Sequence, residues 1–441
     1  MFGINSLINS INNAINDGTL SRKELASAFG SIENIESSSV TSVNAVNDLP
    51  YPVNNKGMFF YIKNENRYVF SDGVSWKMSI NDISNLYAWG QNGSGQLGDN
   101  TTIINKSSPT RSVSFTDWIS ASAGREHSLG VRANGTLWTW GRNSYGQLGN
   151  NIASIINQSS PVSVIGGFTD WISASAGGYH SIGVRANGTL WAWGRNNYGQ
   201  LGNNTVISNR SPVLAVGGFA DWISASAGRE HSLGVRANGT LWAWGANASG
   251  RLGDNTAISR SSPVSVVGGF TDWISADGGA EFSLGVRANG TLWAWGYNGS
   301  GRLGDGTTIP RSSPVSVVGG FTDWISASAG DSHSLGVRAN GTLWAWGSNS
   351  DGELGDVTTA SKSSPVSVVG GFTDWISASA GDDHSLGVRA NGTLWAWGRN
   401  GSGRLGDGTT IPKSSPVSVV GGFTDWVSVS AGSFHNIGVR G

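Results

Sequence analysis

Residues 289–304 read Asn-Gly-Thr-Leu-Trp-Ala-Trp-Gly-Tyr-Asn-Gly-Ser-Gly-Arg-Leu-Gly, and this stretch decides the fold. A turn-forming Asn-Gly pair precedes a short run that ends in Trp-Gly, and a glycine-rich loop follows. The Trp-Gly pair and the loop after it occur seven times, and the Asn-Gly pair before the strand occurs six times, because the first copy lacks it. The Trp-Gly pairs are 51 residues apart, with one interval of 53, and begin at Trp89, Trp140, Trp193, Trp244, Trp295, Trp346 and Trp397. Self-similarity at this period indicates a repeat architecture.

Each repeat unit contains four short runs bounded by glycine or proline, a pattern typical of strands. In the unit that ends at Trp295 they are residues 263–267, 273–276, 283–288 and 291–295. Asn289-Gly290 suits a tight type I′ hairpin between the last two. Four antiparallel strands per unit, repeated seven times, predict an all-β fold, a seven-bladed β-propeller.

Side chains alternate along the last strand of this unit. Trp293 and Trp295 share one face, and Leu292 and Ala294 share the other. We therefore expect the indole rings of one blade to pack against the small-residue face of the next.

The two ends of the repeat array complete each other. The last unit stops at Val439-Arg440-Gly441, where an Asn-Gly turn and a tryptophan-containing strand would follow. That strand occurs instead at residues 86–90, Leu-Tyr-Ala-Trp-Gly, without preceding strands of its own unit. We expect three C-terminal strands to pair with this N-terminal strand, which closes the ring and leaves no unit half-built.

The composition argues against several classes of function. The chain has 441 residues, no cysteine and a formal net charge of −1. Without cysteine there is no disulfide, thiol nucleophile or thiolate metal site, and the balanced charge offers no electrostatic footprint for nucleic acid. The N-terminal residues lack the regions of a standard secretory signal, and no apolar stretch is long enough to span a bilayer, so we expect no membrane insertion.

Residues 1–85 differ from the repeats. Ser21 and Glu24 could cap a short helix, and an earlier possible helix has one apolar face made of Ile4, Leu7, Ile8, Ile11 and Ile15. We interpret residues 1–45 as a helical attachment or oligomerisation region, residues 46–85 as a small β adaptor and residues 86–441 as the propeller. The adaptor is similar to short modules of bacteriophage tail-fibre and other virion proteins.

Two sequence motifs connect the repeats to a known family. Residues 124–128, Gly-Arg-Glu-His-Ser, and residues 140–149, Trp-Gly-Arg-Asn-Ser-Tyr-Gly-Gln-Leu-Gly, resemble the repeat of the regulator-of-chromosome-condensation family. The resemblance covers residues 86–441. It implies a seven-bladed propeller with a strand exchanged between the chain ends.

The resemblance implies binding rather than chemistry. The eukaryotic founder looks like a nucleotide-exchange factor with basic tails and an inserted wedge, and this sequence has neither. Other members resemble pure binding modules, including bacterial propellers that cap and inhibit an enzyme. Because one fold hosts many functions, we interpret the chain as a non-enzyme without a cofactor.

All histidines occupy one repeat position, with Phe282 in the remaining unit: His127, His180, His231, His333, His384 and His435. A metal needs ligands that converge at roughly 2.1 Å, whereas the repeat symmetry places these residues in separate blades. Structural hydrogen bonding is therefore favoured over a metal site. Arginines equivalent to Arg132 and aspartates equivalent to Asp117 also recur beside turns at one end of each blade, where we expect weak ion pairs rather than catalysis.

The copies differ mostly at one face. In an antiparallel blade alternate turns emerge at the same end, so the loop before the histidine and the loop after Trp-Gly share what we call the variable face. Tyrosine and arginine are favoured anchors of recognition, and neutral drift at loop tips is the alternative explanation. The candidate binding residues on this face are Arg125, Glu126, Arg142, Tyr145, Tyr179, Arg195, Tyr198, Arg229, Glu230, Glu281, Phe282, Tyr297, Asp331, Asp351, Glu353, Asp382, Asp383, Arg399 and Phe434.

Two functional hypotheses follow. The order of parts and the fibre-like adaptor favour a bacteriophage virion protein, a tail fibre or similar. Its N-terminal region would bind other virion proteins, and its propeller would bind a host surface receptor or another protein. The alternative is a bacterial propeller, cytoplasmic or extracellular, that binds or inhibits another protein. Both leave homo-oligomer formation open.

Overall fold

The computed structural model describes residues 84–112, 115–152 and 156–441, and the backbone of four strands nearer the N-terminus. The chain divides into two units, residues 1–83 and 84–441. In the first unit β1 (Thr41–Val43) pairs in parallel with β2 (Phe59–Ile62), and β3 (Arg67–Ser71) and β4 (Trp76–Met78) extend the sheet in antiparallel order.

The N-terminal predictions have two outcomes. Both predicted helices, the one from Ile4 to Ile15 and the one capped by Ser21 and Glu24, lie outside the described residues. β1 lies within residues 1–45, so this region is not wholly helical. Its sequence, Thr-Ser-Val, contains two β-branched residues, which favour extended backbone.

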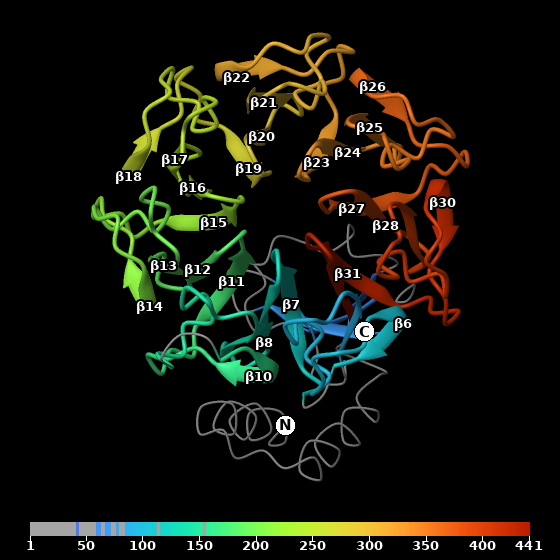
Figure 1. The fold of residues 1–441 in the computed structure, drawn as a ribbon, viewed down its shortest axis with the longest axis horizontal. Coiled ribbons are helices and arrows are strands. Elements are labelled where there is room, and N and C mark those ends of the chain that lie inside the picture. Colours follow the sequence, from blue (N-terminus) through green and yellow to red (C-terminus); the bar gives the residue numbers. More distant parts are fainter. Residues whose placement is uncertain are drawn as a thin grey trace. The chain divides into compact units, whose positions relative to one another are not determined.

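Seven four-stranded antiparallel sheets make up residues 84–441, and they are arranged as blades around a ring (Figure 1). The all-β, seven-bladed prediction is confirmed. The innermost strands are β7 (Trp118–Ala123), β11 (Trp171–Ala176), β15 (Trp222–Ala227), β19 (Trp273–Gly278), β23 (Trp324–Ala329), β27 (Trp375–Ala380) and β31 (Trp426–Ala431). The second strands are β8 (His127–Arg132), β12 (His180–Arg185), β16 (His231–Arg236), β20 (Phe282–Arg287), β24 (His333–Arg338), β28 (His384–Arg389) and β32 (His435–Arg440).

The two remaining positions of each blade lie toward the outside of the ring. The third strands are β9 (Leu137–Gly141), β13 (Leu190–Gly194), β17 (Leu241–Gly245), β21 (Leu292–Gly296), β25 (Leu343–Gly347), β29 (Leu394–Gly398) and β5 (Asn85–Gly90). The outermost strands are β10 (Gln158–Ser163), β14 (Asn209–Leu214), β18 (Arg260–Ser265), β22 (Arg311–Ser316), β26 (Lys362–Ser367), β30 (Lys413–Ser418) and β6 (Lys106–Arg111).

The blade that closes the ring is composite, with strand order β31-β32-β5-β6. Its register places Ala88 opposite Ile437 and Tyr87 opposite Gly438, so the chain ends meet as predicted. The division of strands was predicted wrongly: two C-terminal strands join two N-terminal strands, not three and one. The strand after each Trp-Gly loop forms a hairpin with the strand before that loop, as β18 does with β17, and therefore belongs to the earlier blade.

The hairpin after each second strand also differs from its prediction. Only Gly290 has positive φ in the Asn289-Gly290 pair, at 72°, whereas a type I′ turn needs positive φ at both central residues. Gly290 N donates to Arg287 O, so Ala288 and Asn289 occupy the turn centre. Asn289 Oδ1 accepts from Thr291 N and Oγ1, and these bonds fix the turn without a left-handed asparagine.

The core consists of apolar layers between neighbouring blades. Trp324 and Trp346 of one blade pack with Leu292 and Ala294 of the blade before it. The predicted contact between indole rings and the small-residue face is present, but its direction was predicted wrongly, because the rings contact the preceding blade and not the next one. At about 25 cal/mol per Å², a fully buried indole contributes on the order of 4–6 kcal/mol, which chain entropy opposes. At the closure, Leu86, Ala88, Ile437 and Val439 pack together with Trp118 and Trp140, so the composite blade joins the same core.

Serines of the innermost strands connect each blade to the next. Ser122 Oγ accepts from Ala176 N at 3.0 Å, and Ser430 Oγ accepts from Ala123 N across the chain ends. In the fourth blade Asp277 replaces this serine and accepts from Ser226 Oγ and Ala329 N. Burial raises the pKa of Asp277 above its usual range.

Val357 is the one described residue other than glycine and asparagine with positive φ, at 66°. The equivalent Asn255 has a φ of 60° and the equivalent Gly306 a φ of 78°. A β-branched residue is strained there, because its Cβ crowds the backbone. We expect Val357→Asn to raise the free energy of unfolding by about 1 kcal/mol, measured from the urea midpoint. Asn255→Val should lower the free energy of unfolding by a similar amount. If Asn255→Val leaves the free energy of unfolding unchanged, Val357 is not strained.

Candidate functional site

Hydrogen bonds join the loops of the variable face in pairs. Arg142 N donates to Glu126 O at 2.8 Å, and Tyr297 N donates to Glu281 O at 2.9 Å. The loop after each Trp-Gly therefore lies beside the loop before the histidine position of the same blade, as predicted. On the opposite face, Ala133 N donates to Asp117 O and Trp171 N to Gly135 O, which joins the near-identical turns there.

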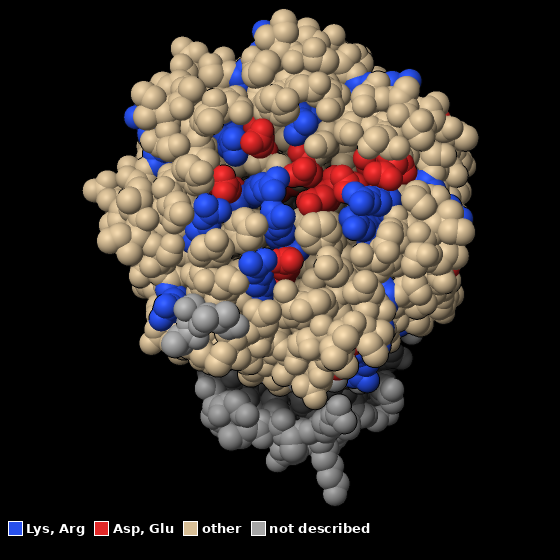
Figure 2. Space-filling view, in the orientation of Figure 1, with Lys and Arg blue, Asp and Glu red and all other residues tan. Residues whose placement is uncertain are grey.

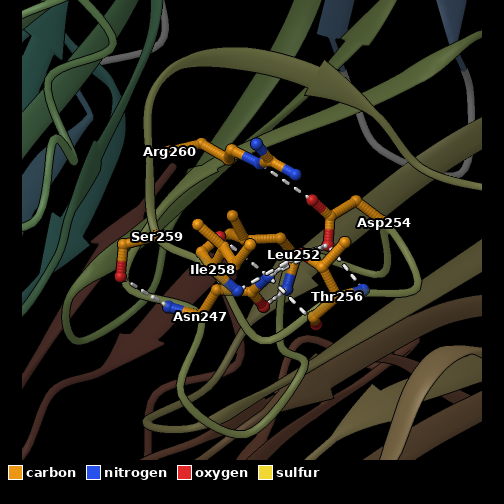
Figure 3. Close-up of polar contacts among 7 residues, drawn as sticks. All are labelled: Asn247, Leu252, Asp254, Thr256, Ile258, Ser259 and Arg260. Atoms are coloured by element: carbon orange, nitrogen blue, oxygen red, sulfur yellow. Dashed lines mark hydrogen bonds and ion pairs between the residues drawn. The ribbon is translucent and has the colours of Figure 1, made fainter.

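A buried asparagine braces each long loop of the variable face, as Asn247 shows (Figure 3). Its Oδ1 accepts from Leu252 N, and its Nδ2 donates to Asp254 Oδ1, Thr256 O and Ile258 O. Arg260 Nε then donates to the other oxygen of Asp254 at 3.0 Å. These loops are held by their own polar atoms before any partner arrives, which lowers the entropic cost of binding.

Glu353 belongs to this bracing and is not a presented binding residue. It is 2% exposed, and its carboxylate accepts from Asp351 N at 2.9 Å. In the second blade Gln200 Oε1 accepts from Tyr198 N in the same way. Burial raises the pKa of Glu353. The sequence prediction was wrong for Glu353 because one repeat position carries both glutamine and glutamate with the same structural role.

A cavity of about 90 Å³ lies where the innermost strands end at the variable face. We call it the channel mouth. Each blade contributes the residue after its glycine, in order Arg125, Gly178, Arg229, Ala280, Asp331, Asp382 and Ser433. The lining residues give the mouth a cationic half with Arg125 and Arg229 and an acidic half with Asp331 and Asp382. Figure 2 shows acidic side chains gathered over β23 and β27, and basic side chains over β11, β15 and also beside the acidic ones over β27.

Contacts at the mouth leave charges incompletely paired. Arg229 Nη1 reaches Asp331 Oδ1 at 3.4 Å across two blades. The Arg125 guanidinium lies 5.3 Å from the Tyr179 ring and 5.9 Å from the Phe434 ring, and no carboxylate among the described residues forms an ion pair with it. Asp382 has the Ser433 hydroxyl as a hydrogen-bond partner and no ion pair within the described part of the chain.

The acidic half has raised pKa values. Burial and the charge of Asp331 raise the pKa of Asp382 to about 6. Burial also raises the pKa of Asp331, although Arg229 and Arg302 oppose the shift. A raised carboxyl pKa means that the surroundings stabilise the negative charge less well than water does.

Three tyrosines surround Arg195 beside the mouth. Its guanidinium lies 5.4 Å from the Tyr145 ring, 5.5 Å from Tyr179 and 5.8 Å from Tyr198. Arg195 Nη1 donates to Glu230 at 2.9 Å, while its Nε is buried without a partner among the described residues. Tyr198 is 40% exposed. The structure therefore brings these candidate residues together as an aromatic cluster with a polar centre.

The remaining candidates are arranged in pairs around the face. Arg142 pairs with Glu126, and Arg399 pairs with Asp383 at 3.0 Å. Tyr297 lies under the guanidinium of Arg302. Phe282 was predicted wrongly: it is fully buried and packs in the core between blades, because it takes the place of a buried histidine.

The sequence predictions missed three arginines that support the mouth. Arg251 donates to Ala280 O, Arg302 to Asp331 O and Arg404 to Ser433 O. Each is almost fully buried, and each holds the carbonyl of a mouth residue in the next blade. The sequence does mark this position as variable, because the first three repeats have Gln96, Gln147 and Gln200 where these arginines stand.

The histidines have the structural role predicted for them. Each is fully buried, and its Nε2 contacts a polar side chain of the next blade, as His127 contacts Ser181 Oγ at 2.9 Å. His435 contacts Ser128 across the closure at 2.8 Å. Burial lowers the pKa of His127, His180, His384 and His435 to about 3 and that of His333 to about 4.

The predicted arginine–aspartate pairs are also present. Arg132 Nε donates to Asp117 Oδ1 at 2.7 Å, and the six equivalent pairs have the same geometry within 0.1 Å. Each guanidinium also covers an aromatic ring, as Arg132 covers Phe115 at 3.9 Å. Among the described residues no group of three His, Cys, Asp or Glu could hold a metal ion, and no helix is long and apolar enough to cross a bilayer.

Comparison with known proteins places this geometry in a family. The model of the RCC1-like domain matches residues 52–335, and the model of the regulator of chromosome condensation (RCC1) repeat matches residues 340–388 and 391–439. The chain belongs to the RCC1 repeat family. Its structure is similar to that of human WBSCR16, with a TM-score of 0.73, 21% identity and coverage of 81% of this chain and 98% of that one.

Two curated proteins are similar to this chain in sequence. The ultraviolet-B receptor UVR8 of Arabidopsis thaliana is 28% identical over 359 residues, which are 79% of this chain and 80% of the receptor. The human E3 ubiquitin-protein ligase HERC2 is 27% identical over 76% of this chain, a match that covers only 7% of the ligase. Yeast RCC1 (Prp20), solved with Kap60 bound, has a TM-score of 0.72, 19% identity and coverage of 81% of this chain and 89% of that one.

Proposed function

We propose that this RCC1-repeat propeller is a protein-binding regulator that engages its partner through the variable face. The observation that carries the proposal is the contrast between the two faces. Braced loops present tyrosine, arginine and acidic side chains that differ from blade to blade, whereas the opposite face repeats one arginine–aspartate pair seven times. Aromatic and arginine anchors on rigid loops are typical of recognition surfaces.

The relatives support a binding role of this kind. One is a receptor, and yeast RCC1 was solved in complex with a protein. The match to HERC2 is confined to a small part of that ligase, so it does not extend ligase activity to this chain. Of the two functions that the sequence suggests, the relatives favour a propeller that binds or inhibits another protein.

Affinity purification with the full chain as bait tests the proposal. We expect one stoichiometric partner to be recovered with the wild-type chain and with Asp374→Asn on the opposite face. Tyr198→Ala combined with Arg195→Gln should lose it, because these changes remove an exposed ring and the charge at the centre of the aromatic cluster. A partner kept by the double variant, or lost with Asp374→Asn, would refute the choice of face.

The virion role stays a separate proposal. It rests on the similarity of residues 46–85 to virion modules and on the order of the parts. It predicts that the protein is present in purified phage particles, with a label on the propeller seen at a fibre or on the capsid. Absence of the protein from purified particles would remove this proposal and leave the protein-binding function intact.

A further inference from the structure

The channel mouth offers charges that the chain itself pairs incompletely. Arg125 and Asp382 both line the cavity, and neither forms an ion pair among the described residues. Arg229 and Asp331 do pair, but at 3.4 Å, longer than the 2.7 Å pairs on the opposite face. The mouth therefore presents an anion-binding half and a cation-binding half within one cavity.

The mouth is also held in place before anything binds. Arg229 N donates to Gly279 O at 3.1 Å and Asp331 N to Gly381 O at 3.1 Å, so these loops are tied to the following blade. The buried Arg302 and Arg404 fix the carbonyls of Asp331 and Ser433 from below. A site whose backbone does not reorganise loses less free energy on binding.

We propose that the channel mouth binds a segment of a protein partner that presents a basic and an acidic side chain close together. The basic group would lie between Asp331 and Asp382, and the acidic group would meet Arg125. The inference rests on the proposed protein-binding function and names the chemistry of the partner at that face.

The existing contacts show that each half can accept its group. Arg229 already brings a guanidinium into the acidic half, where it contacts Asp331. A partner lysine or arginine beside Asp382 would relieve the unfavourable surroundings that raise the pKa of this carboxyl. On the other side, Tyr179 and Phe434 flank the Arg125 guanidinium and leave it without a carboxylate, and charge-assisted hydrogen bonds to arginine are strong.

The size of the cavity limits what can enter. A volume of about 90 Å³ admits side chains and not a folded segment. The rest of the partner would then lie on the surrounding loops, among them the tyrosines around Arg195. Arg125 and the Arg195 cluster both contact the Tyr179 ring, so the mouth is continuous with the exposed Tyr198. The proposal therefore commits to a peptide segment that reaches the mouth and this cluster together, rather than to a free small molecule or a second copy of this chain.

Selection of peptides from a randomised display library on the full wild-type chain tests this inference. We expect the enriched peptides to share a basic and an acidic residue close together. Their affinity, measured by fluorescence anisotropy with the synthesised peptides, should fall at least tenfold with Arg125→Gln and with Asp382→Asn, and should not change with Asp374→Asn on the opposite face. Circular dichroism would confirm that each variant is folded.

Other outcomes would overturn the inference in distinguishable ways. Enrichment of purely basic, purely acidic or uncharged peptides, or of none, would contradict the mixed-charge site. Displacement of the peptides by free lysine or glutamate at equal affinity would identify a small-molecule site, and a dimer in sedimentation that Arg125→Gln dissolves would identify a second copy as the occupant. Peptides lost with Tyr198→Ala but kept by both mouth variants would refute the mouth and leave the proposed function standing.

Discussion

Lowering the pH from 7.5 to 5.0 is expected to reduce the free energy of unfolding by on the order of 10 kcal/mol. The cause is the set of six buried histidines. Burial holds their pKa values at about 3 to 4, or well below the ordinary value in the case of His231, so they stay neutral in the folded chain. In the unfolded chain each titrates near pH 6.5.

The sign follows from proton uptake. Below pH 6.5 the histidines bind protons in the unfolded state but stay neutral in the folded state. The free energy of unfolding therefore decreases as the pH falls toward the pKa values of the folded state. At pH 5 each histidine lowers the free energy of unfolding by about 2 kcal/mol. The six histidines together account for the expected loss. The raised pKa values of Asp277, Asp331, Glu353 and Asp382 act in the opposite direction and offset part of the loss.

Urea unfolding at several pH values, followed by tryptophan fluorescence, measures this dependence. The chain supplies its own control substitution, because Phe282 already replaces a histidine in the fourth blade. His231→Phe should therefore fold and should reduce the loss at pH 5 by about 2 kcal/mol. A urea midpoint that stays constant from pH 7.5 to 5.0 would show that the buried histidines are not the titrating groups.

Trp89→Ala is expected to cost about 3–5 kcal/mol of unfolding free energy, as much as Trp295→Ala in an uninterrupted blade. Both indoles are fully buried, and both donate to a loop carbonyl of the preceding blade: Trp89 to Arg404 O at 3.0 Å and Trp295 to Arg251 O at 2.9 Å. Their contacts with the inner tryptophan of the same blade also match, at 5.8 Å and 6.0 Å between ring centroids.

The comparison of Trp89→Ala with Trp295→Ala tests whether the two chain ends close the ring. Trp89 comes from the N-terminal strand β5, and its neighbour Trp426 comes from the C-terminal strand β31. If the two chain ends did not form one sheet, Trp89 would lack this environment and its truncation would cost little. Equal losses in urea unfolding support the closure, and a loss confined to Trp295→Ala would refute it.

The sequence predicted features that depend on spacing within one repeat. The Trp-Gly period, the histidine position and the completion of the chain ends all follow from comparing copies of one unit. The assignment of the proline-containing strand failed because sequence order does not say whether a strand at a unit boundary pairs backward or forward. In the structure it pairs backward, as β22 does with β21.

The candidate site was predictable as a face but not as a set of contacts. Loop variation located Arg125, Arg229, Asp331 and Asp382 on one side of the ring. Their convergence on one cavity depends on the circular arrangement, which brings Arg229 to a residue 102 positions away. The prediction failed at Phe282 and Glu353 because both side chains are buried. A repeat position can vary between copies in the core or within a loop's own hydrogen bonds, as well as at the exposed surface.

The closure of the ring is the claim on which the two faces and the channel mouth depend, and a designed disulfide tests it directly. The chain has no cysteine, and Asn85 lies opposite Arg440 in the β5–β32 pair. The Cα atoms of directly opposite residues in antiparallel strands are separated by a distance that a disulfide can span. Asn85→Cys with Arg440→Cys should oxidise to a cross-linked chain that migrates faster on a non-reducing gel, whereas Asn85→Cys with Arg389→Cys should not. Free thiols in the first variant, or equal cross-linking in both, would contradict the closed propeller.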